Sequence, residues 1–181
     1  LASATGGGSE RPDKNTAIGY LTLSSIGALG ACNTAVGYYA GVSLTHGAAP
    51  FCTSPNNNTF IGICAGRFAT TAGFNTAVGS HSFCSLTTGG YNIALGCQAG
   101  RNLTTGNHNI FIGRQTSPSD ASETCSITIG DQVSSCGSNT LRLGGTSLTS
   151  IFAAVTTITS TSDIRDKCDI QSLVEGKSFL K

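Results

Sequence analysis

A short sequence motif of polar and apolar positions, which we call the word, recurs along most of the chain. It reads NTAIGY at Asn15–Tyr20 and returns as NTAVGY at Asn33–Tyr38. Later versions read NTFIGI, NTAVGS, NIALGC and NIFIGR. A fixed period of this kind is the signature of a repeat architecture. The closing glycines are Gly19, Gly37, Gly62, Gly79, Gly96, Gly113, Gly130 and Gly144, with successive spacings of 18, 25, 17, 17, 17, 17 and 14 residues.

The unit that contains the word predicts one coil of a parallel β-solenoid. It is clearest at residues 92–106, which read NIALGCQAGRNLTTG. The pattern indicates a short strand, a Gly turn, a step of small residues, a second short strand and another Gly turn. Seventeen residues are too few for the helix pair of a helical repeat. We therefore expect an all-β fold with coils over 15–145 and a closing β segment over 146–161. Residues 1–14 are expected to be a linker or the end of a preceding segment.

Two apolar positions precede the closing glycine in each of the first six words, from Gly19 to Gly113. Neighbouring residues of a strand face opposite ways, so these positions form two separate columns. One column holds large aliphatic side chains, such as Ile18 and Val36, and the other holds mostly small ones, such as Ala17 and Ala35. We expect the large column to fill the interior of the solenoid. The small column would then let a second copy of the chain approach closely.

The asparagine that opens each word is expected to form a ladder. If the coils stack in register, each side-chain amide can bond to the one above. The closing glycine fits a sharp turn, because such turns often need a positive φ, which costs glycine nothing sterically. The predicted structural ladder comprises Asn15, Asn33, Asn58, Asn75, Asn92, Asn109, Gly19, Gly37, Gly62, Gly79, Gly96 and Gly113.

The 25-residue spacing marks an insertion at residues 46–58, which includes Pro50 and Pro55. Insertions in a solenoid leave as loops on one face. This loop is either a surface for a specific contact or a tolerated insertion without a ligand, and the sequence does not favour one over the other.

Composition restricts the classes of function. Charged residues make up 10% of the chain, the net charge is +1, and there are 24 glycines. The absence of a basic stripe argues against a nucleic-acid partner. No apolar run reaches the roughly 20 residues of a membrane span, so we expect no membrane insertion. The chain begins at Leu1, contains no Met and lacks the layout of a signal peptide, so we interpret it as a piece of a longer product.

The residues that could carry chemistry show no catalytic or metal-binding pattern. The eight cysteines do not share a column in adjacent coils, so we expect buried free thiols, with one or two irregular bridges as the alternative. There is no C-x-x-C, and His46, His81 and His108 are isolated, so we predict no metal and no cofactor. Paired carboxylates, which a glycosidase needs, do not occur between Asn15 and Asn109. We do not expect an enzyme.

The last twenty residues differ from the coils in composition. They read SDIRDKCDIQSLVEGKSFLK and include eight charged residues. The residue pattern alone favours the start of a helix, with Ser162 or Asp163 as the N-cap and with Ile170, Leu173 and Val174 on one face.

Two motifs resemble those of known families. SDIRDKCDI resembles the opening of the intramolecular chaperone domain at the carboxyl end of phage tail fibres, endosialidase tailspikes and related viral fibre proteins. LVEGKSFLK is similar to that domain's first helix, and TSIFAAVTT resembles a segment that often precedes it. The resemblance implies a trimeric β-fibre that matures by self-cleavage, with Ser162 as nucleophile and Lys167 as its base.

The chain stops at Lys181, before such a domain would be complete, so we expect no cleavage in this chain. The coil word itself is similar to repeats of viral fibres and to the left-handed parallel β-roll in the heads of trimeric autotransporter adhesins.

These observations predict a structural function. We expect a homotrimeric segment of a fibre or spike at a virion surface, which presents a binding surface for a host receptor, a glycan in particular. An ice-binding solenoid is the alternative from another class, because threonine recurs at the second position of the word in Thr16, Thr34, Thr59 and Thr76. A cell-surface adhesin or extracellular filament subunit is the third interpretation.

Overall fold

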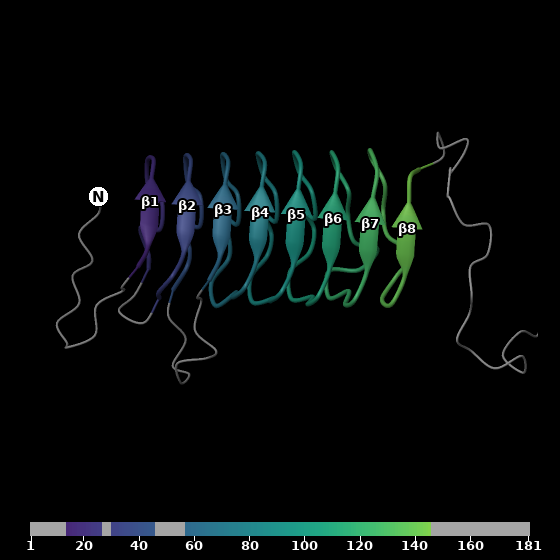
Figure 1. Cartoon of the computed structure of the whole chain (residues 1–181). Helices are drawn as coiled ribbons and strands as arrows, with labels where there is room; N and C mark the ends of the chain where they lie inside the picture. Colours follow the sequence, from purple (N-terminus) through teal and green to yellow (C-terminus); the bar gives the residue numbers. More distant parts are fainter. Residues whose placement is uncertain (1–13, 27–29, 46–56, 146–181) are drawn as a thin grey trace, which may run out of the picture. The chain divides into compact units, whose positions relative to one another are not determined.

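The computed structural model describes residues 14–26, 30–45 and 57–145. In this part the chain winds as a parallel β-solenoid of about seven turns, without a helix, and the predicted fold class is confirmed. Each coil contributes one strand of three residues (Figure 1). The strands are β1 (Thr16–Ile18), β2 (Thr34–Val36), β3 (Thr59–Ile61), β4 (Thr76–Val78), β5 (Ile93–Leu95), β6 (Ile110–Ile112), β7 (Ile127–Ile129) and β8 (Leu141–Leu143).

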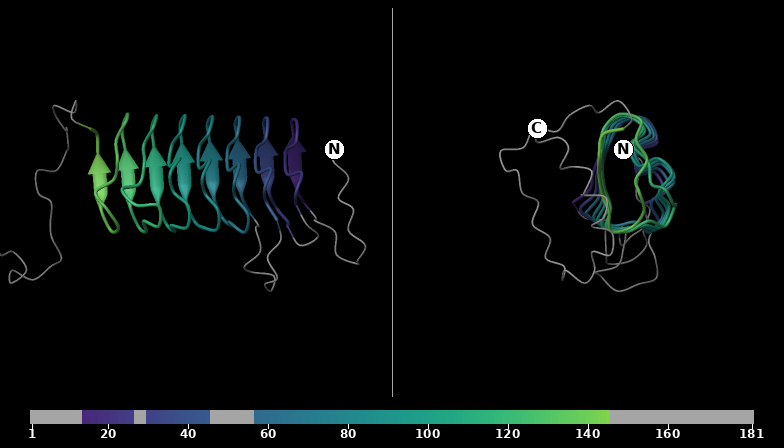
Figure 2. Two further views of the ribbon diagram at one scale, coloured as in Figure 1. Left: turned by 180° about the vertical axis from the view of Figure 1, so that it is seen from behind. Right: turned by 90° about the vertical axis from the view of Figure 1, so that its right-hand side faces the viewer.

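The strands pair in chain order and without any shift in register. Thr34 of β2 lies beside Thr59 of β3, and Val78 of β4 lies beside Leu95 of β5. Viewed along the stacking direction, the coils lie over one another (Figure 2). Equivalent residues therefore form straight columns, with about 4.8 Å between neighbouring strands.

The expected assignment of the two apolar columns to interior and exterior is wrong. The middle residue of the strand points inward, and Ala35, Phe60 and Ala77 are fully buried. The large aliphatic column points outward instead: Ile18 is 60% exposed and Ile61 is 39% exposed. The asparagine that precedes each of the strands β2–β6 explains the reversal. It is buried, and side chains alternate along a strand, so the residue two positions later also points inward and the residue three positions later points outward.

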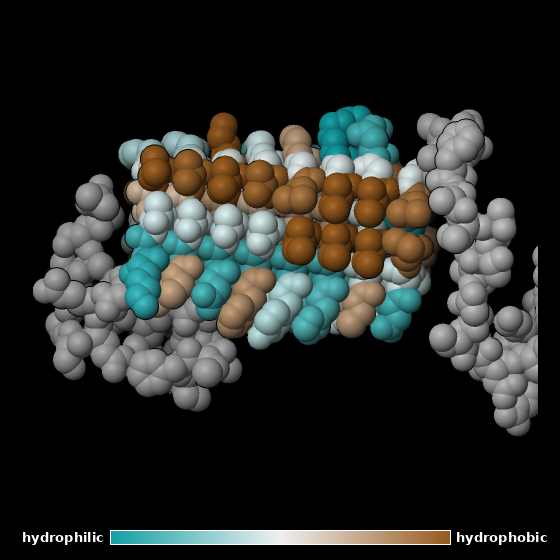
Figure 3. Space-filling model, in the orientation of Figure 1, coloured by the Kyte–Doolittle hydropathy of each residue, from teal (hydrophilic) through white to brown (hydrophobic). Residues whose placement is uncertain are grey.

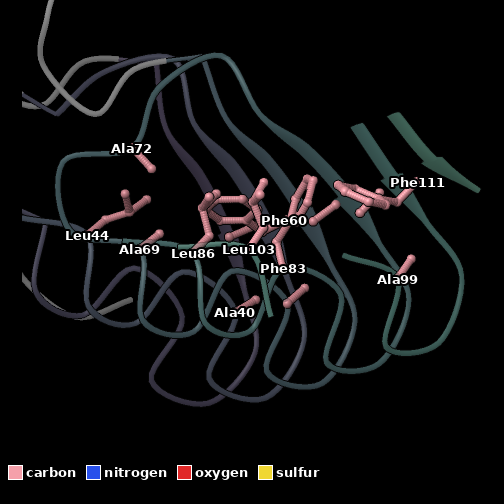
Figure 4. Close-up of a cluster of buried hydrophobic side chains, with 14 of the residues drawn as sticks. Ala40, Leu44, Phe60, Ala69, Ala72, Phe83, Leu86, Ala99, Leu103 and Phe111 are labelled. Atoms are coloured by element: carbon pink, nitrogen blue, oxygen red, sulfur yellow. The ribbon is translucent and has the colours of Figure 1, made fainter. Parts of the chain in front are cut away.

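The interior is filled by alanine methyls, leucines and three phenylalanine rings (Figure 4). Large side chains are accommodated where the opposite wall has no side chain. A Cβ on Gly66 would lie 2.7 Å from the ring of Phe60, and one on Gly100 would lie 2.4 Å from that of Phe83. Phe83 in turn packs edge-on against Phe111, with 6.1 Å between the ring centroids. Each phenylalanine therefore occupies space that a glycine leaves open.

The second strand predicted for each coil does not form. In the coil that begins at Asn75 this segment is residues 84–88, which form turns and bends instead of a strand. His81 and Phe83, just before it, have left-handed φ angles of 58° and 45° and turn the chain there. Neighbouring coils are still joined here by backbone hydrogen bonds. The N–H of Phe83 donates to the carbonyl of Ala99 over 3.0 Å, and that of Thr87 donates to Thr104 over 2.8 Å. The coil is thus one short strand closed by a hydrogen-bonded series of turns.

Candidate functional site on the outward sheet face

The orientation of the sheet depends on the buried asparagines. Asn92 donates from its backbone N–H and from Nδ2 to Oδ1 of Asn75, both over 3.0 Å. Its Nδ2 also donates to the carbonyl of Gly106 over 2.9 Å, and its Oδ1 accepts two hydrogen bonds from Asn109. The same contact to the preceding amide recurs at Asn33, Asn58, Asn75 and Asn109, and Ser126 continues it. Since both polar ends of each amide are satisfied inside, the first and third residues of every strand point outward.

The outward sheet face consists of these first and third strand residues. No charged side chain occurs among them. In Figure 3 the third positions form one continuous apolar row across all eight strands. The first positions form a second row, which is polar over part of its length. The outward sheet face comprises Thr16, Thr34, Thr59, Thr76, Ile93, Ile110, Ile127 and Leu141 at the first position, and Ile18, Val36, Ile61, Val78, Leu95, Ile112, Ile129 and Leu143 at the third.

The two halves of this face differ in polarity. Threonine occupies the first position in β1–β4, whereas isoleucine or leucine occupies it in β5–β8. Large aliphatic side chains stay accessible at β5, the first strand of the second half, where Ile93 is 37% and Leu95 is 38% exposed. A flat, uncharged and contiguous apolar surface of this kind is typical of an interaction site rather than of a surface that faces only water.

The polar interior near β7 contains the one buried acidic residue among those that the structure describes. Glu123 is 2% exposed, and its carboxylate accepts hydrogen bonds from the backbone N–H and hydroxyl of Ser119 and from the hydroxyl of Ser135. Burial raises the pKa of this carboxyl group. The hydroxyls of Ser126, Ser135 and Ser119 and the Ser119 N–H outweigh burial, and they lower the pKa below its ordinary value.

We expect Glu123 to make the solenoid sensitive to acid. Because its pKa is lower in the folded than in the unfolded chain, the folded state binds fewer protons, and stability falls as the pH drops through the folded pKa. The melting temperature of the wild type should therefore decrease more steeply below about pH 5 than that of Glu123→Gln. Thermal unfolding followed by circular dichroism over this pH range measures the difference. Parallel curves for the two proteins would contradict the assignment.

Several residues singled out from the sequence lie outside the described part. They include Ser162 and Lys167 of the proposed self-cleavage motif, the segments 1–13 and 146–181, and the insertion except for Asn57 and Asn58. Six cysteines are described, and all are free thiols. Cys64 and Cys84 are buried, but Cys32, Cys97, Cys125 and Cys136 are exposed, so the expectation of buried thiols is wrong for these four.

Within residues 14–26, 30–45 and 57–145, no three His, Cys, Asp or Glu side chains form a group that could hold a metal ion. Nor does the described part contain a helix long and apolar enough to cross a membrane. Comparison of the chain with protein-family models, curated proteins and solved structures gave no match.

Proposed function

We propose that this chain is a structural segment of a homotrimeric fibre or spike at a virion surface. In the proposed trimer, the outward sheet faces of three copies pack around a common axis parallel to the direction of stacking. The observation that carries the proposal is the continuous apolar row at the third strand positions, which runs from Ile18 to Leu143 on an uncharged face. Burial of this row in a protein contact would remove it from water. This would stabilise the contact by roughly 25 cal/mol per Å² of buried apolar surface.

The chemistry of the face is compatible with contact between identical copies. Under cyclic symmetry about an axis along the stack, each coil meets its own equivalent. Threonines would then face threonines at β1–β4, where hydroxyls can bond to one another, and aliphatic side chains would meet at β5–β8. Like charges would not be brought together, since the face carries none. The choice of three copies comes from the resemblance to viral fibres and trimeric adhesin heads.

A substitution on the face should separate assembly from folding. Leu95→Asp places a carboxylate in β5, near the middle of the eight-strand face, so three carboxylates would meet at the proposed axis. We expect the wild-type chain to have the mass of a trimer in multi-angle light scattering, and Leu95→Asp to have that of a monomer with an unchanged circular dichroism spectrum. The control is Asn102→Asp, which should remain trimeric. Asn102 is exposed and lies in the same coil but away from the face. A monomeric wild type would refute the proposal.

Ice binding is a second candidate because of one observation. Thr16, Thr34, Thr59 and Thr76 form an in-register column on the exposed flat face. A regular array of hydroxyls and methyls can order water. Isoleucine or leucine replaces threonine from β5 onward, so the threonine array covers only half of the strands. Thermal hysteresis in the monomeric chain, lost in Thr59→Asp, would favour this function over the fibre.

In the proposed fibre the solenoid acts as a spacer that also carries the receptor-binding surface. A glycan bound weakly by one copy would be bound more tightly by three, because linked sites raise the effective concentration. A subunit of an extracellular filament would instead form head-to-tail polymers, which electron microscopy distinguishes from closed trimers.

A further inference from the structure

An exposed cluster of aromatic rings and one arginine lies on the first three coils. We call it the aromatic–arginine patch and define it as Tyr20, Tyr38, Tyr39, Arg67 and Phe68. Tyr20 and Tyr38 stack with 5.5 Å between their ring centroids, and Tyr39 is inclined at 53° to both. Tyr20, Tyr38 and Phe68 are 64%, 50% and 48% exposed. Large rings held this far out of the core have surface available for a ligand.

The guanidinium of Arg67 is fixed by two of these rings. Its central carbon lies 5.3 Å from the ring centroid of Tyr39 and 5.1 Å from that of Phe68. A guanidinium stacked on an aromatic ring keeps its N–H groups in its own plane, where they can bind a planar oxyanion in a bidentate manner. Because the rings already restrict the side chain, less rotamer entropy is lost when an anion binds.

Among the residues that the structure describes, no acidic side chain pairs with Arg67. Arg114–Asp131 is the only ion pair within the described part of the chain. The stretch from Lys14 to Asn109 contains no Asp or Glu at all. Within the described part, the patch therefore has a cation without an acidic partner and no carboxylate that would repel an anion.

We infer that the aromatic–arginine patch binds an acidic saccharide, in which a sugar ring packs on the tyrosines and its carboxylate or sulfate bonds to Arg67. A pyranose ring offers an apolar C–H face to an aromatic ring, and its hydroxyls can bond with the tyrosine hydroxyls. The anionic group supplies the partner that Arg67 lacks. The inference rests on the proposed function, since it assigns the receptor-binding surface of the fibre to these coils.

The patch lies beside the outward sheet face rather than on it. Tyr20 and Tyr38 directly follow Gly19 and Gly37, the glycines that come after strands β1 and β2. Packing of three faces around an axis would leave three copies of the patch at the same height on the fibre. Three equivalent sites can bind a multivalent glycan surface together.

Binding by the full 181-residue chain to three trisaccharides tests the inference. The probes are trigalacturonate, which is carboxylated, a sulfated trigalactose, and neutral trigalactose. We expect titration calorimetry to detect one or both acidic sugars, and affinity to fall as salt concentration rises. Comparison of the affinities for the two acidic probes shows whether the patch prefers a carboxylate or a sulfate. Equal affinity for the neutral sugar, or no binding of any acidic probe, would overturn the inference.

Variants connect the binding to Arg67. Arg67→Ala should weaken binding at least about tenfold, because a hydrogen-bonded charge is lost. Arg67→Lys, which retains the charge without the planar fork, should weaken it less. Arg101→Ala is the matched control, since Arg101 occupies the same place two coils later without stacked rings, and it should leave affinity unchanged. Unchanged binding in Arg67→Ala would refute the assignment.

The mass of each protein in solution, measured beside sugar binding, distinguishes a failure of this inference from a failure of the proposed function. A trimer that binds no acidic sugar would refute the assignment of the patch and leave the fibre intact. A monomer that binds through Arg67 would refute the trimer and leave the patch.

Discussion

Gly79→Ala is expected to lower the free energy of unfolding by about 4 kcal/mol. Gly79 has a φ of 130°, which side-chain-bearing residues rarely adopt. An added Cβ would also lie 2.4 Å from the carbonyl oxygen of Gly96 in the next coil. That atom belongs to the backbone, so relief requires the two coils to separate where β4 and β5 are paired. Urea unfolding followed by circular dichroism measures the loss.

Gly137→Ala is the matched control for this substitution. Gly137 also has a positive φ, 110°, but an added Cβ would meet no atom within 4 Å. We expect it to cost about 1–2 kcal/mol, from backbone strain alone. The difference in free energy of unfolding between the two variants then measures the cost of the contact between the added Cβ and the next coil. Equal effects would show that the glycines are needed only for their φ angle.

Asn75→Ala is expected to destabilise the solenoid by about 3–4 kcal/mol. The substitution removes the acceptor of the buried Asn92 N–H and the side-chain donor to the carbonyl of Gly89. Both groups lie where water does not replace the missing partner, and an unsatisfied buried polar group costs about 1–3 kcal/mol. The melting temperature and the urea midpoint should both fall.

Asn102→Ala provides the comparison, since Asn102 is exposed. We expect a change within about 0.5 kcal/mol, which is usual for surface substitutions. If Asn75→Ala changed the free energy of unfolding equally little, the column of asparagine amides would not be what sets the register of the coils. The difference between the two variants therefore measures what the ladder contributes to the regular stacking of coils.

Regular stacking connects stability to the proposed role. Contacts in a solenoid are made mainly with the neighbouring coil, so each level depends on the one beside it. Asn92, for example, contacts amides in both adjacent coils. A rod held by such repeated contacts keeps its side faces in fixed alignment, which both the outward sheet face and the aromatic–arginine patch require.

Much of the fold could be predicted because the repeat constrains it. Gly62 and Gly79 are one period apart, and they lie in neighbouring coils with φ angles of 133° and 130°. The in-register pairing of Thr59 with Thr76 follows from the same period. In contrast, the second strand of each coil was predicted from apolar pattern alone. The chain turns at the left-handed residues His81 and Phe83 just before this segment, and neither residue type indicates a positive φ.

The surfaces proposed to bind partners were harder to predict than the coils. The large aliphatic column was expected inside, but Ile61 and Leu95 point outward. The asparagine three residues earlier carried the necessary signal, because two positions three apart on a strand cannot face the same side. The aromatic–arginine patch had no such signal. Tyr39 and Arg67 are far apart in the chain and meet only because their coils are adjacent.

The sequence by itself determined the period, the parallel stacking and the columns of identical residues, because a repeat of about 17 residues returns each position to the same place one strand further on. Only the tertiary structure decided which side of the strand is buried and which side chains from different columns meet. The interior admits an alanine methyl or a phenylalanine opposite a glycine, and the buried asparagine amides satisfy one another there. Closure of the coil, rather than local preference, therefore turns the large aliphatic residues outward.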